Sequence, residues 1–231
     1  MTQRPSDMKI YDDLEQGTEE WLEARRGILT ASTIGKLITP KTMKVASNDT
    51  ARALIRTLTA ERITGHIEPV FVTADMEFGQ MIEPIARQMY ADWQNVEVKE
   101  IGFITREIDG HTLGYSPDGL IGDDGLIEIK SRRQHIQLDT ILTGKVPAAN
   151  MAQIQTGLLV TGRAWCDYLS FCSDMPLYRI RVKPNEAWQT AIRAALETFE
   201  DVAAGYIANY QQATEGLPVA DRIDMNLEMV I

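Results

Sequence analysis

The strongest constraint on the fold is an apolar strand that carries two opposite charges. Residues 126–130 read Leu-Ile-Glu-Ile-Lys. Alternate residues of a strand point to opposite faces, so Glu128 and Lys130 project together while Ile127 and Ile129 face the other way. A strand this apolar is expected to be buried, and buried charges are costly unless they pair or bind a metal. The segment therefore predicts a core strand with a charged site on one face.

An acid lies close enough in sequence to join that site. Residues 114–120 read Gly-Tyr-Ser-Pro-Asp-Gly-Leu, and residues 123–125, Asp-Asp-Gly, are a strong hairpin signal before the apolar strand. The hairpin would return Asp118 to Glu128 and Lys130. Carboxylates hold divalent cations, and a lysine orients or activates an attacking water, so this set suits a metal-dependent phosphodiesterase. The alternatives are a Glu128–Lys130 surface ion pair and an ordinary type I turn.

The spacing Asp-x9-Glu-x-Lys resembles the PD-(D/E)xK nuclease superfamily. Three further segments resemble motifs of the phage lambda exonuclease (YqaJ-type viral recombinase) family, in the same order and at similar spacing. They are residues 21–32, residues 78–87 and residues 151–155. The resemblance runs from about Gln16 to about Lys183.

The expected elements predict a mixed α/β fold. The resemblance implies a restriction-endonuclease-like core, with a central mixed β-sheet flanked by helices. We expect one PD-(D/E)xK exonuclease domain over residues 1–231, with an extended tail over residues 210–231. Thr18 is expected to cap the first helix, and residues 40–47 to form a basic, mobile loop. Further helices are expected at residues 31–38, 48–64, 74–93 with a kink at Pro84, 135–142, 148–160 and 185–208, and strands at 96–105, 112–115, 126–130, 165–171 and 177–182.

Asp118 and Glu128 are the expected metal ligands, and Lys130 is expected to lie against the attacking water. Hard oxygen ligands favour Mg²⁺, with two ions expected and Mn²⁺ able to substitute. The resemblance adds the backbone carbonyl of Ile129 as a ligand, and Glu83 and Gln153 as further catalytic residues. From the residues alone, Glu83 could instead form a helix ion pair with Arg87, four positions on. Gln153 could simply be a polar position on an apolar helix.

The resemblance also implies a pocket for a terminal 5′ phosphate, formed by Arg25, Ser32 and Ser116. A phosphate monoester suits an arginine surrounded by hydroxyl donors. Arg26 is the adjacent candidate, but the family pattern Arg-x-Gly-x-x-Thr-Ala-Ser selects Arg25. Trp21 could pack on DNA or fill the core, and we favour the core. The family commonly has an aromatic residue where this chain has Asn150.

The net charge of −10 and the pI of about 4.8 stand against DNA binding, because DNA affinity comes from Lys and Arg that neutralise phosphates. An acidic protein can still bind DNA if its positive charge is concentrated in a channel. Candidate clusters, each of which could also be a solvated face, are Arg25–Arg26, Lys36 with Lys41 and Lys44, Arg52 with Arg56, and Lys130 with Arg132, Arg133 and His135. The last cluster adjoins the predicted metal site.

Two cysteines, Cys166 and Cys172, without a signal-peptide core indicate a reduced, cytoplasmic protein rather than a disulfide framework. No apolar run approaches the ~18 residues of a membrane span. The resemblance implies a phage or prophage protein acting in a bacterial host cell.

The expected function is a Mg²⁺-dependent, processive 5′→3′ exonuclease. It would degrade the 5′-ended strand of double-stranded DNA to mononucleotides and leave 3′ single strands for recombination by annealing. The resemblance implies a homotrimeric ring around DNA and a phage single-strand annealing protein as partner. The alternatives are an endonuclease of the same superfamily, which would lack the phosphate pocket, and a non-catalytic DNA-end clamp, which would have lost the metal site.

Overall fold

Two four-stranded sheets form the centre of the protein. The structure is a computed structural model that describes residues 7–69 and 73–223. The first sheet has the strand order β1–β5–β6–β2. Its strands are β1 (Met8–Tyr11), β5 (Phe103–Ile108), β6 (His111–Tyr115) and β2 (Leu29–Thr30). Strand β2 runs parallel to β6, and the other neighbours are antiparallel.

The second sheet carries the predicted Glu-Ile-Lys strand. Its order is β10–β9–β8–β7, with β7 (Gly119–Ile121), β8 (Gly125–Ser131), β9 (Trp165–Phe171) and β10 (Tyr178–Val182). Strands β8 and β9 are parallel, and α5 (Gln134–Thr143) and α6 (Ala148–Thr161) form the crossover between them. A parallel pair needs such a crossover because its strands start at the same end. The predicted α/β fold with mixed sheets is confirmed.

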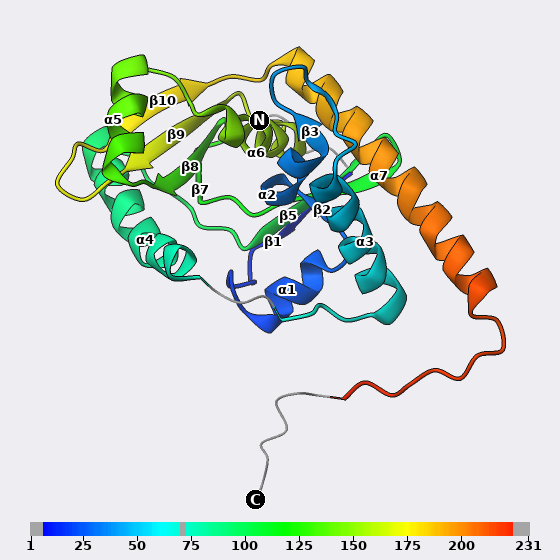
Figure 1. The fold of residues 1–231 in the computed structure, drawn as a ribbon. Coiled ribbons are helices and arrows are strands. Elements are labelled where there is room, and N and C mark those ends of the chain that lie inside the picture. The colour runs from blue at the N-terminus through cyan, green and yellow to red at the C-terminus, as the bar shows by residue number, and fades with distance from the viewer. Residues whose placement is uncertain (1–6, 70–72, 224–231) are drawn as a thin grey trace, which may run out of the picture.

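The remaining helices cover the sheets on two sides (Figure 1). They are α1 (Glu19–Arg25), α2 (Ala31–Ile34), α3 (Asp49–Thr64), α4 (Ala74–Gln94) and α7 (Glu186–Ala213), with a 3₁₀ turn, η1, at Gly35–Leu37. Helix α4 packs on β8, and α5 packs on β9. On the other side α3 packs on α7, and α2 packs on α6. The Glu-Ile-Lys strand therefore lies between α4 and α6.

Helix ends follow local sequence signals. The side chains of Thr18, Asn48 and Asn185 accept hydrogen bonds from the backbone N–H groups three residues on, as N-caps do. Gly65 ends α3 with φ of +66°, a backbone conformation that glycine adopts at little cost. The predicted hairpin at residues 123–125 joins β7 to β8 and is confirmed.

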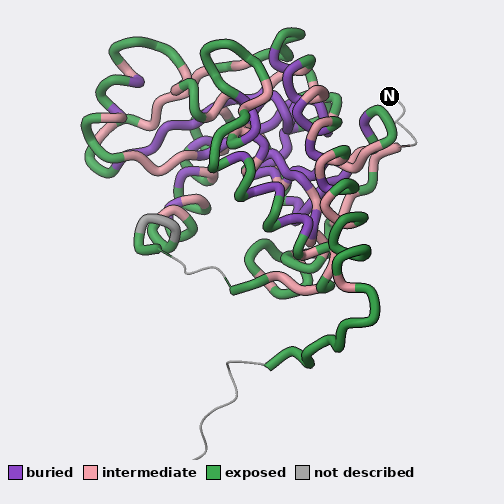
Figure 2. The backbone as a smooth tube through the Cα atoms, turned by 45° about the vertical axis from the view of Figure 1, so that its right-hand side comes forward, coloured by how far each residue is buried: buried purple, intermediate pink, exposed green. Residues whose placement is uncertain are grey.

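The hydrophobic core has two parts. The larger part lies among the first sheet, α2, α3, α6 and α7, and Figure 2 shows this buried chain at the centre of the molecule. The smaller part lies between α4 and the outer face of β8 and β9, and includes Ile82, Ala86, Ile127, Ile129 and Leu169. Strand β8 is thus covered on both faces, as its apolar sequence predicts.

Several predicted boundaries are wrong. The helix expected at residues 31–38 ends earlier, and the loop expected at 40–47 contains β4 (Lys44–Val45), which pairs with β3 (Ile38–Thr39). Pairing lets Ile38 be buried while Val45 packs against the core. The strand expected from residue 96 begins only at Phe103, because the preceding residues form an isolated bridge, Lys99 to Leu120, instead of a continuous strand.

The C-terminal region also differs from expectation at its start. Helix α7 continues to Ala213, so residues 210–213 of the expected tail are helical. Residues 217–223 form neither helix nor strand, and residues 224–231 lie outside the described part of the chain. Among the described residues, no helix is both long and apolar enough to cross a membrane.

Candidate active site

The two charges of β8 lie together on one face, as predicted. The Lys130 ammonium donates a hydrogen bond to Glu128 Oε1 at 2.5 Å. Glu128 is fully buried, whereas 26% of the Lys130 side chain is exposed. Ile127 and Ile129 face the opposite way, into the smaller core beneath α4. The pair is therefore a buried ion pair with one end open to solvent, and the alternative of a solvated surface pair is wrong.

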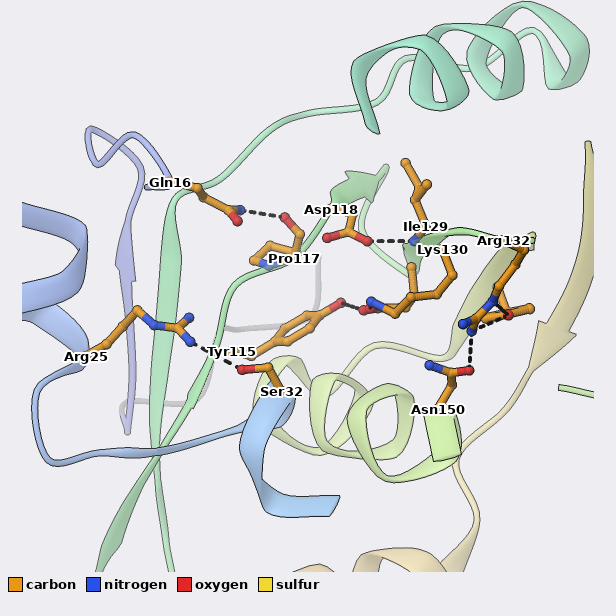
Figure 3. Close-up of polar contacts among 12 residues, drawn as sticks. Gln16, Arg25, Ser32, Tyr115, Pro117, Asp118, Ile129, Lys130, Arg132 and Asn150 are labelled. Carbon is orange, nitrogen blue, oxygen red and sulfur yellow. Dashed lines mark hydrogen bonds and ion pairs between the residues drawn. The ribbon is translucent and has the colours of Figure 1, made fainter. Parts of the chain in front are cut away.

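Asp118 returns to this strand through the β6–β7 connection. Its Oδ2 accepts a hydrogen bond from the Ile129 backbone N–H at 2.6 Å (Figure 3). The Tyr115 hydroxyl reaches Glu128 Oε2 from the other side at 3.5 Å. The Tyr115 ring in turn lies against Gly157 of α6, where an added Cβ would approach within 2.7 Å. The predicted meeting of Asp118, Glu128 and Lys130 at one site is what the structure shows.

Burial and crowding make the acids of this site hold their protons. Desolvation, with the nearby Asp118 charge, raises the pKa of Glu128 to about 7. Desolvation also raises the pKa of Asp118. For Lys130, desolvation acts to lower the pKa, but the Glu128 and Asp118 charges outweigh it and raise the pKa above its ordinary value. Burial therefore disfavours the charged forms of both acids, whereas Lys130 keeps its ammonium charge.

Glu128→Gln is expected to stabilise the metal-free protein at pH 8. Glu128 keeps its proton up to about pH 7 when folded, but releases it near 4.5 when unfolded. The folded state binds more protons in this window, so the free energy of unfolding falls as the pH rises from about 4.5 to about 7. Removing the carboxylate should recover on the order of 1–3 kcal/mol at pH 8 and little below pH 4.5.

The measurement is denaturant unfolding in EDTA at pH 4.5, 6 and 8. Glu97→Gln, at an exposed position, is the matched control and should leave the pH dependence unchanged. Parallel stability profiles for wild type and Glu128→Gln would contradict the assignment of the buried charge.

Glu83 comes to the site on α4, and Arg87 fixes it there. Arg87 forms ion pairs with Glu83 and, at 2.6 Å, with Glu100. Its Nε also donates to the backbone carbonyl of Asp118 at 2.8 Å. The Glu83–Arg87 helix pair therefore exists, and it also ties α4 to the Asp118 turn. Desolvation and the Asp118 charge raise the pKa of Glu83 to about 7. The catalytic role of Glu83 stays a prediction.

Helix α4 is held against the sheet by a second buried charge. Tyr90 donates its hydroxyl to Asp167 Oδ2 at 2.7 Å, and Arg181 donates to both Asp167 oxygens at 2.7 and 2.8 Å. Asp167 is fully buried on β9. A buried carboxylate that accepts from a planar arginine and a hydroxyl is well satisfied. This network fixes the helix that carries Glu83.

Gln153 lies half-buried on α6, the helix packed beside β8. Within the described residues it has no recorded hydrogen bond to the acids or to Lys130, so its catalytic role stays a prediction. Asn150, at the start of the same helix, accepts a hydrogen bond from Arg132. Arg132 also donates to the Tyr168 hydroxyl at 2.8 Å. The position where the resemblance led us to expect an aromatic residue is therefore Asn150, which is hydrogen-bonded to Arg132, two residues after Lys130.

The residues predicted to bind a phosphate do meet. Arg25 donates to Ser116 Oγ at 2.8 Å and to Ser32 Oγ at 3.3 Å. Figure 3 shows Arg25 and Ser32 on one side of Tyr115, with Asp118 and Lys130 on the other. Arg26 instead pairs with Glu23 at 2.9 Å. Desolvation lowers the pKa of Arg25 to about 10, which still leaves it charged near neutral pH.

Sequence reasoning missed three contributors. Tyr115 was not singled out, although it is an aromatic residue directly before Ser116. Arg87 was considered only as a helix partner. Trp21 was expected to fill the core, yet it is half-buried and its indole N–H lies 3.0 Å from both Ser116 Oγ and the Gly102 carbonyl. The Arg25 guanidinium lies over its ring, 4.0 Å from the centroid.

The donor set fits a hard divalent cation. Asp118 and Glu128 are buried oxygen donors whose mutual repulsion a cation would relieve. Among the described residues, no group of three or more His, Cys, Asp or Glu side chains is arranged as a metal site. Any further protein ligand would have to come from a backbone oxygen, as predicted for Ile129, or from Glu83 turning away from Arg87.

Fold and site together define the class of protein: a nuclease with a restriction-endonuclease-like fold. Residues 20–164 match the YqaJ-like viral recombinase domain, and the chain therefore belongs to that family. The structure is similar to that of an alkaline exonuclease from Laribacter hongkongensis, with 31% sequence identity and a TM-score of 0.76. The match covers 87% of this chain and 100% of that one, and the same values hold for its complex with dAMP. The predicted enzyme class, a deoxyribonuclease, is confirmed.

A phage related exonuclease from Haemophilus somnus 129PT shares the fold at 10% identity, with a TM-score of 0.60 over 79% of this chain and 96% of that one. No curated protein matches the sequence.

Proposed function

We propose that this nuclease is a 5′→3′ exonuclease that degrades the 5′-ended strand of duplex DNA to mononucleotides and leaves a 3′ single strand. The observation that carries the proposal is the position of Ser116, two residues before Asp118 on one short connection. Two residues of extended chain span at most about 7 Å. Arg25 binds Ser116 at 2.8 Å, so a phosphate held there would lie about one nucleotide from the carboxylates. Cleavage at that distance releases one nucleotide at a time.

The relative from Laribacter hongkongensis supports this proposal. It is named as an alkaline exonuclease and has been solved in complex with dAMP, a nucleoside monophosphate. We extend that chemistry to this chain, with mononucleotides as the products. Ser32 and Ser116 would supply hydroxyl donors to the terminal phosphate, and Arg25 the positive charge.

We propose Mg²⁺ as the cofactor, with two ions and with Mn²⁺ able to substitute. Asp118, Glu128 and the Ile129 carbonyl would be the ligands, and Glu83 and Gln153 would border them. When bound, such ions activate water and stabilise the leaving oxygen. We assign Lys130 the role of orienting the attacking water and stabilising the developing charge on the phosphate, because its ammonium lies on the same face of β8 as Glu128 and donates to Glu128 Oε1.

The experiment that tests the function is digestion of a linear duplex labelled at either the 5′ or the 3′ end, with Mg²⁺ and with EDTA. We expect Mg²⁺-dependent release of the 5′ label as a mononucleotide from the start, while the 3′ label stays on long strands. Early release of the 3′ label would contradict the direction. Release in EDTA would contradict the metal dependence.

A closed-circular plasmid separates the exonuclease from an endonuclease of the same superfamily. An exonuclease leaves the circle intact while it degrades a linear duplex beside it. Nicking or linearisation would support the endonuclease. No degradation of either substrate would support a DNA-end clamp. The presence of Asp118, Glu128 and Lys130 argues against such a clamp, because a non-catalytic protein is expected to have lost its metal site.

We further propose that the chain, as one domain, assembles into a homotrimeric ring that encloses DNA. An exposed apolar stripe on α4 supports protein–protein contact. Its residues follow one face at helical spacing and are 43–69% exposed: Phe78, Met81, Ile85, Met89 and Trp93. A positively lined channel inside a ring would reconcile DNA binding with the net charge of −10.

Met89→Glu is expected to shift the protein from a trimer to a monomer of 25.9 kDa in sedimentation experiments at moderate salt. A charge in the centre of a desolvated contact opposes association because it must lose its water. Leu142→Glu, which places the same charge at a 74% exposed position on α5, is the matched control. A wild-type protein that sediments only as a monomer would contradict the ring.

The remaining proposals concern the biological setting. We propose that the single strands feed recombination by annealing, with a phage single-strand annealing protein as the partner. The viral recombinase family supports a phage or prophage origin and action in the cytoplasm of a bacterial host.

A further inference from the structure

Two neighbouring residues of α3 form hydrogen bonds to the turn that follows α1, the helix that carries Arg25. Gly27 lies between α1 and β2 with φ of +64°. Its backbone N–H donates to Glu61 Oε2 at 2.7 Å, and its carbonyl accepts from Arg62 Nε at 2.7 Å. An added Cβ would lie 2.5 Å from the Arg62 side chain. Glycine suits this turn because a Cβ would displace Arg62, and both backbone polar groups of Gly27 are hydrogen-bonded by distant side chains.

Arg62 is in turn held in place by an ion pair with Glu200. Arg62 donates through both terminal nitrogens to the two carboxylate oxygens of Glu200 on α7, at 2.6 and 2.7 Å. This planar, two-point pairing restricts the arginine more than a single contact does. The Arg62 guanidinium also lies over the ring of buried Phe199, 4.9 Å from its centroid. The turn is therefore tied through α3 to the longest helix in the described chain.

The turn determines where Arg25 can point. Arg25 is the last residue of α1, and its carbonyl accepts a hydrogen bond from the Ile28 N–H at 3.0 Å across the turn. Glu61 also acts on Arg25 through charge, because it opposes the effect of desolvation on the pKa of the guanidinium. Glu61 therefore affects both the backbone beside Arg25 and its charge, without contacting the phosphate pocket itself.

We infer that Glu61 and Arg62 are positioning residues that hold Arg25 for recognition of a 5′-terminal phosphate, with Glu200 as their anchor. The inference rests on the proposed function. It adds residues that do not contact the phosphate but affect the selectivity for phosphorylated ends. Because recognition by an arginine depends on fixed geometry, a loosened turn weakens the preference for a phosphate before it affects the chemistry at Lys130.

The test compares initial rates on duplexes with 5′-phosphoryl and 5′-hydroxyl ends. Glu61→Ala is expected to lower the ratio of the two rates by about fivefold, as the loss of one well-placed hydrogen bond predicts. The change should lie in KM for the phosphorylated end, with kcat largely retained. Glu61→Gln keeps an oxygen that can accept from Gly27, and should restore the ratio to within about twofold of wild type.

Arg52→Ala is the matched control, since Arg52 is also on α3 and pairs with exposed Asp49 at 2.6 Å. It should leave the ratio unchanged. All rates are measured at a temperature well below the midpoint of thermal unfolding of each variant. A Glu61→Ala protein that loses stability but keeps the wild-type ratio overturns the inference. Should that variant not fold, Glu200→Ala, which removes the anchor from Arg62, is expected to lower the ratio by about two- to threefold, and an unchanged ratio there overturns the inference as well.

Arg25→Ala separates this inference from the proposed function. If Arg25→Ala abolishes the phosphate preference while Glu61→Ala and Glu200→Ala retain it, the positioning role fails and the pocket stands. If Arg25→Ala itself retains the preference, the pocket fails and the positioning role fails with it.

Discussion

Lys130→Ala is expected to lower the rate of strand degradation by about a thousandfold or more, which is about 4 kcal/mol of transition-state stabilisation. Lys130 donates directly to Glu128 at 2.5 Å, and 26% of its side chain is exposed. A charge placed this way acts mostly on the transition state, so kcat should fall while affinity for the duplex changes little.

The measurement is a single-turnover rate on an end-labelled duplex, with binding followed separately by fluorescence anisotropy in EDTA. Lys145→Ala removes an exposed lysine from the α5–α6 loop and serves as the matched control. A Lys130→Ala enzyme that degrades DNA at the wild-type rate would remove Lys130 from the chemistry. Equal loss of binding and rate would reduce its role to holding DNA.

Arg25→Ala is expected to slow digestion of 5′-phosphorylated ends by about 10- to 100-fold more than digestion of 5′-hydroxyl ends. Hydrogen bonds to charged groups contribute about 1.5–3 kcal/mol, and the hydroxyl end lacks the charge that Arg25 would meet. Arg25 is held by Ser116 and Ser32 and by the Trp21 ring, so its guanidinium is oriented before any ligand arrives.

Arg26→Ala is the control for Arg25, because it deletes the neighbouring arginine, which pairs with Glu23. It should slow both kinds of end to a similar, small extent. Equal losses on the two ends for Arg25→Ala would remove the phosphate-pocket assignment, whatever the total loss of rate.

The elements that the sequence predicts well are those with local causes. The Asn48 cap and Gly65 stop of α3, and the Asp-Asp-Gly turn before β8, are set by side chains within a few residues of the backbone they affect. The alternation in β8 follows from strand geometry alone, so the opposite orientations of Ile129 and Lys130 needed no knowledge of their neighbours.

The parts that could not be predicted depend on distant partners. Strand β1 reads as a polar terminal segment and is ordered by pairing with β5, almost a hundred residues away. The contacts of Arg87 with Asp118, and of Trp21 with Ser116, join residues 31 and 95 positions apart. No local pattern specifies these contacts, so the sequence could bring Asp118, Glu128 and Lys130 together through a hairpin but could not predict the hydrogen bonds that support them.

The position of Trp21 gives the proposed phosphate pocket a fluorescent reporter within the chain. Its indole N–H and its ring touch the same two residues, Ser116 and Arg25, that a terminal phosphate would engage. The emission of an indole depends on nearby charge and on its hydrogen bond, so occupancy of the pocket would change it. The three other tryptophans, Trp93, Trp165 and Trp188, lie on α4, β9 and α7. Replacing them with phenylalanine would leave Trp21 as the single tryptophan. Selective excitation of its indole would then follow unlabelled DNA ends as they arrive and leave.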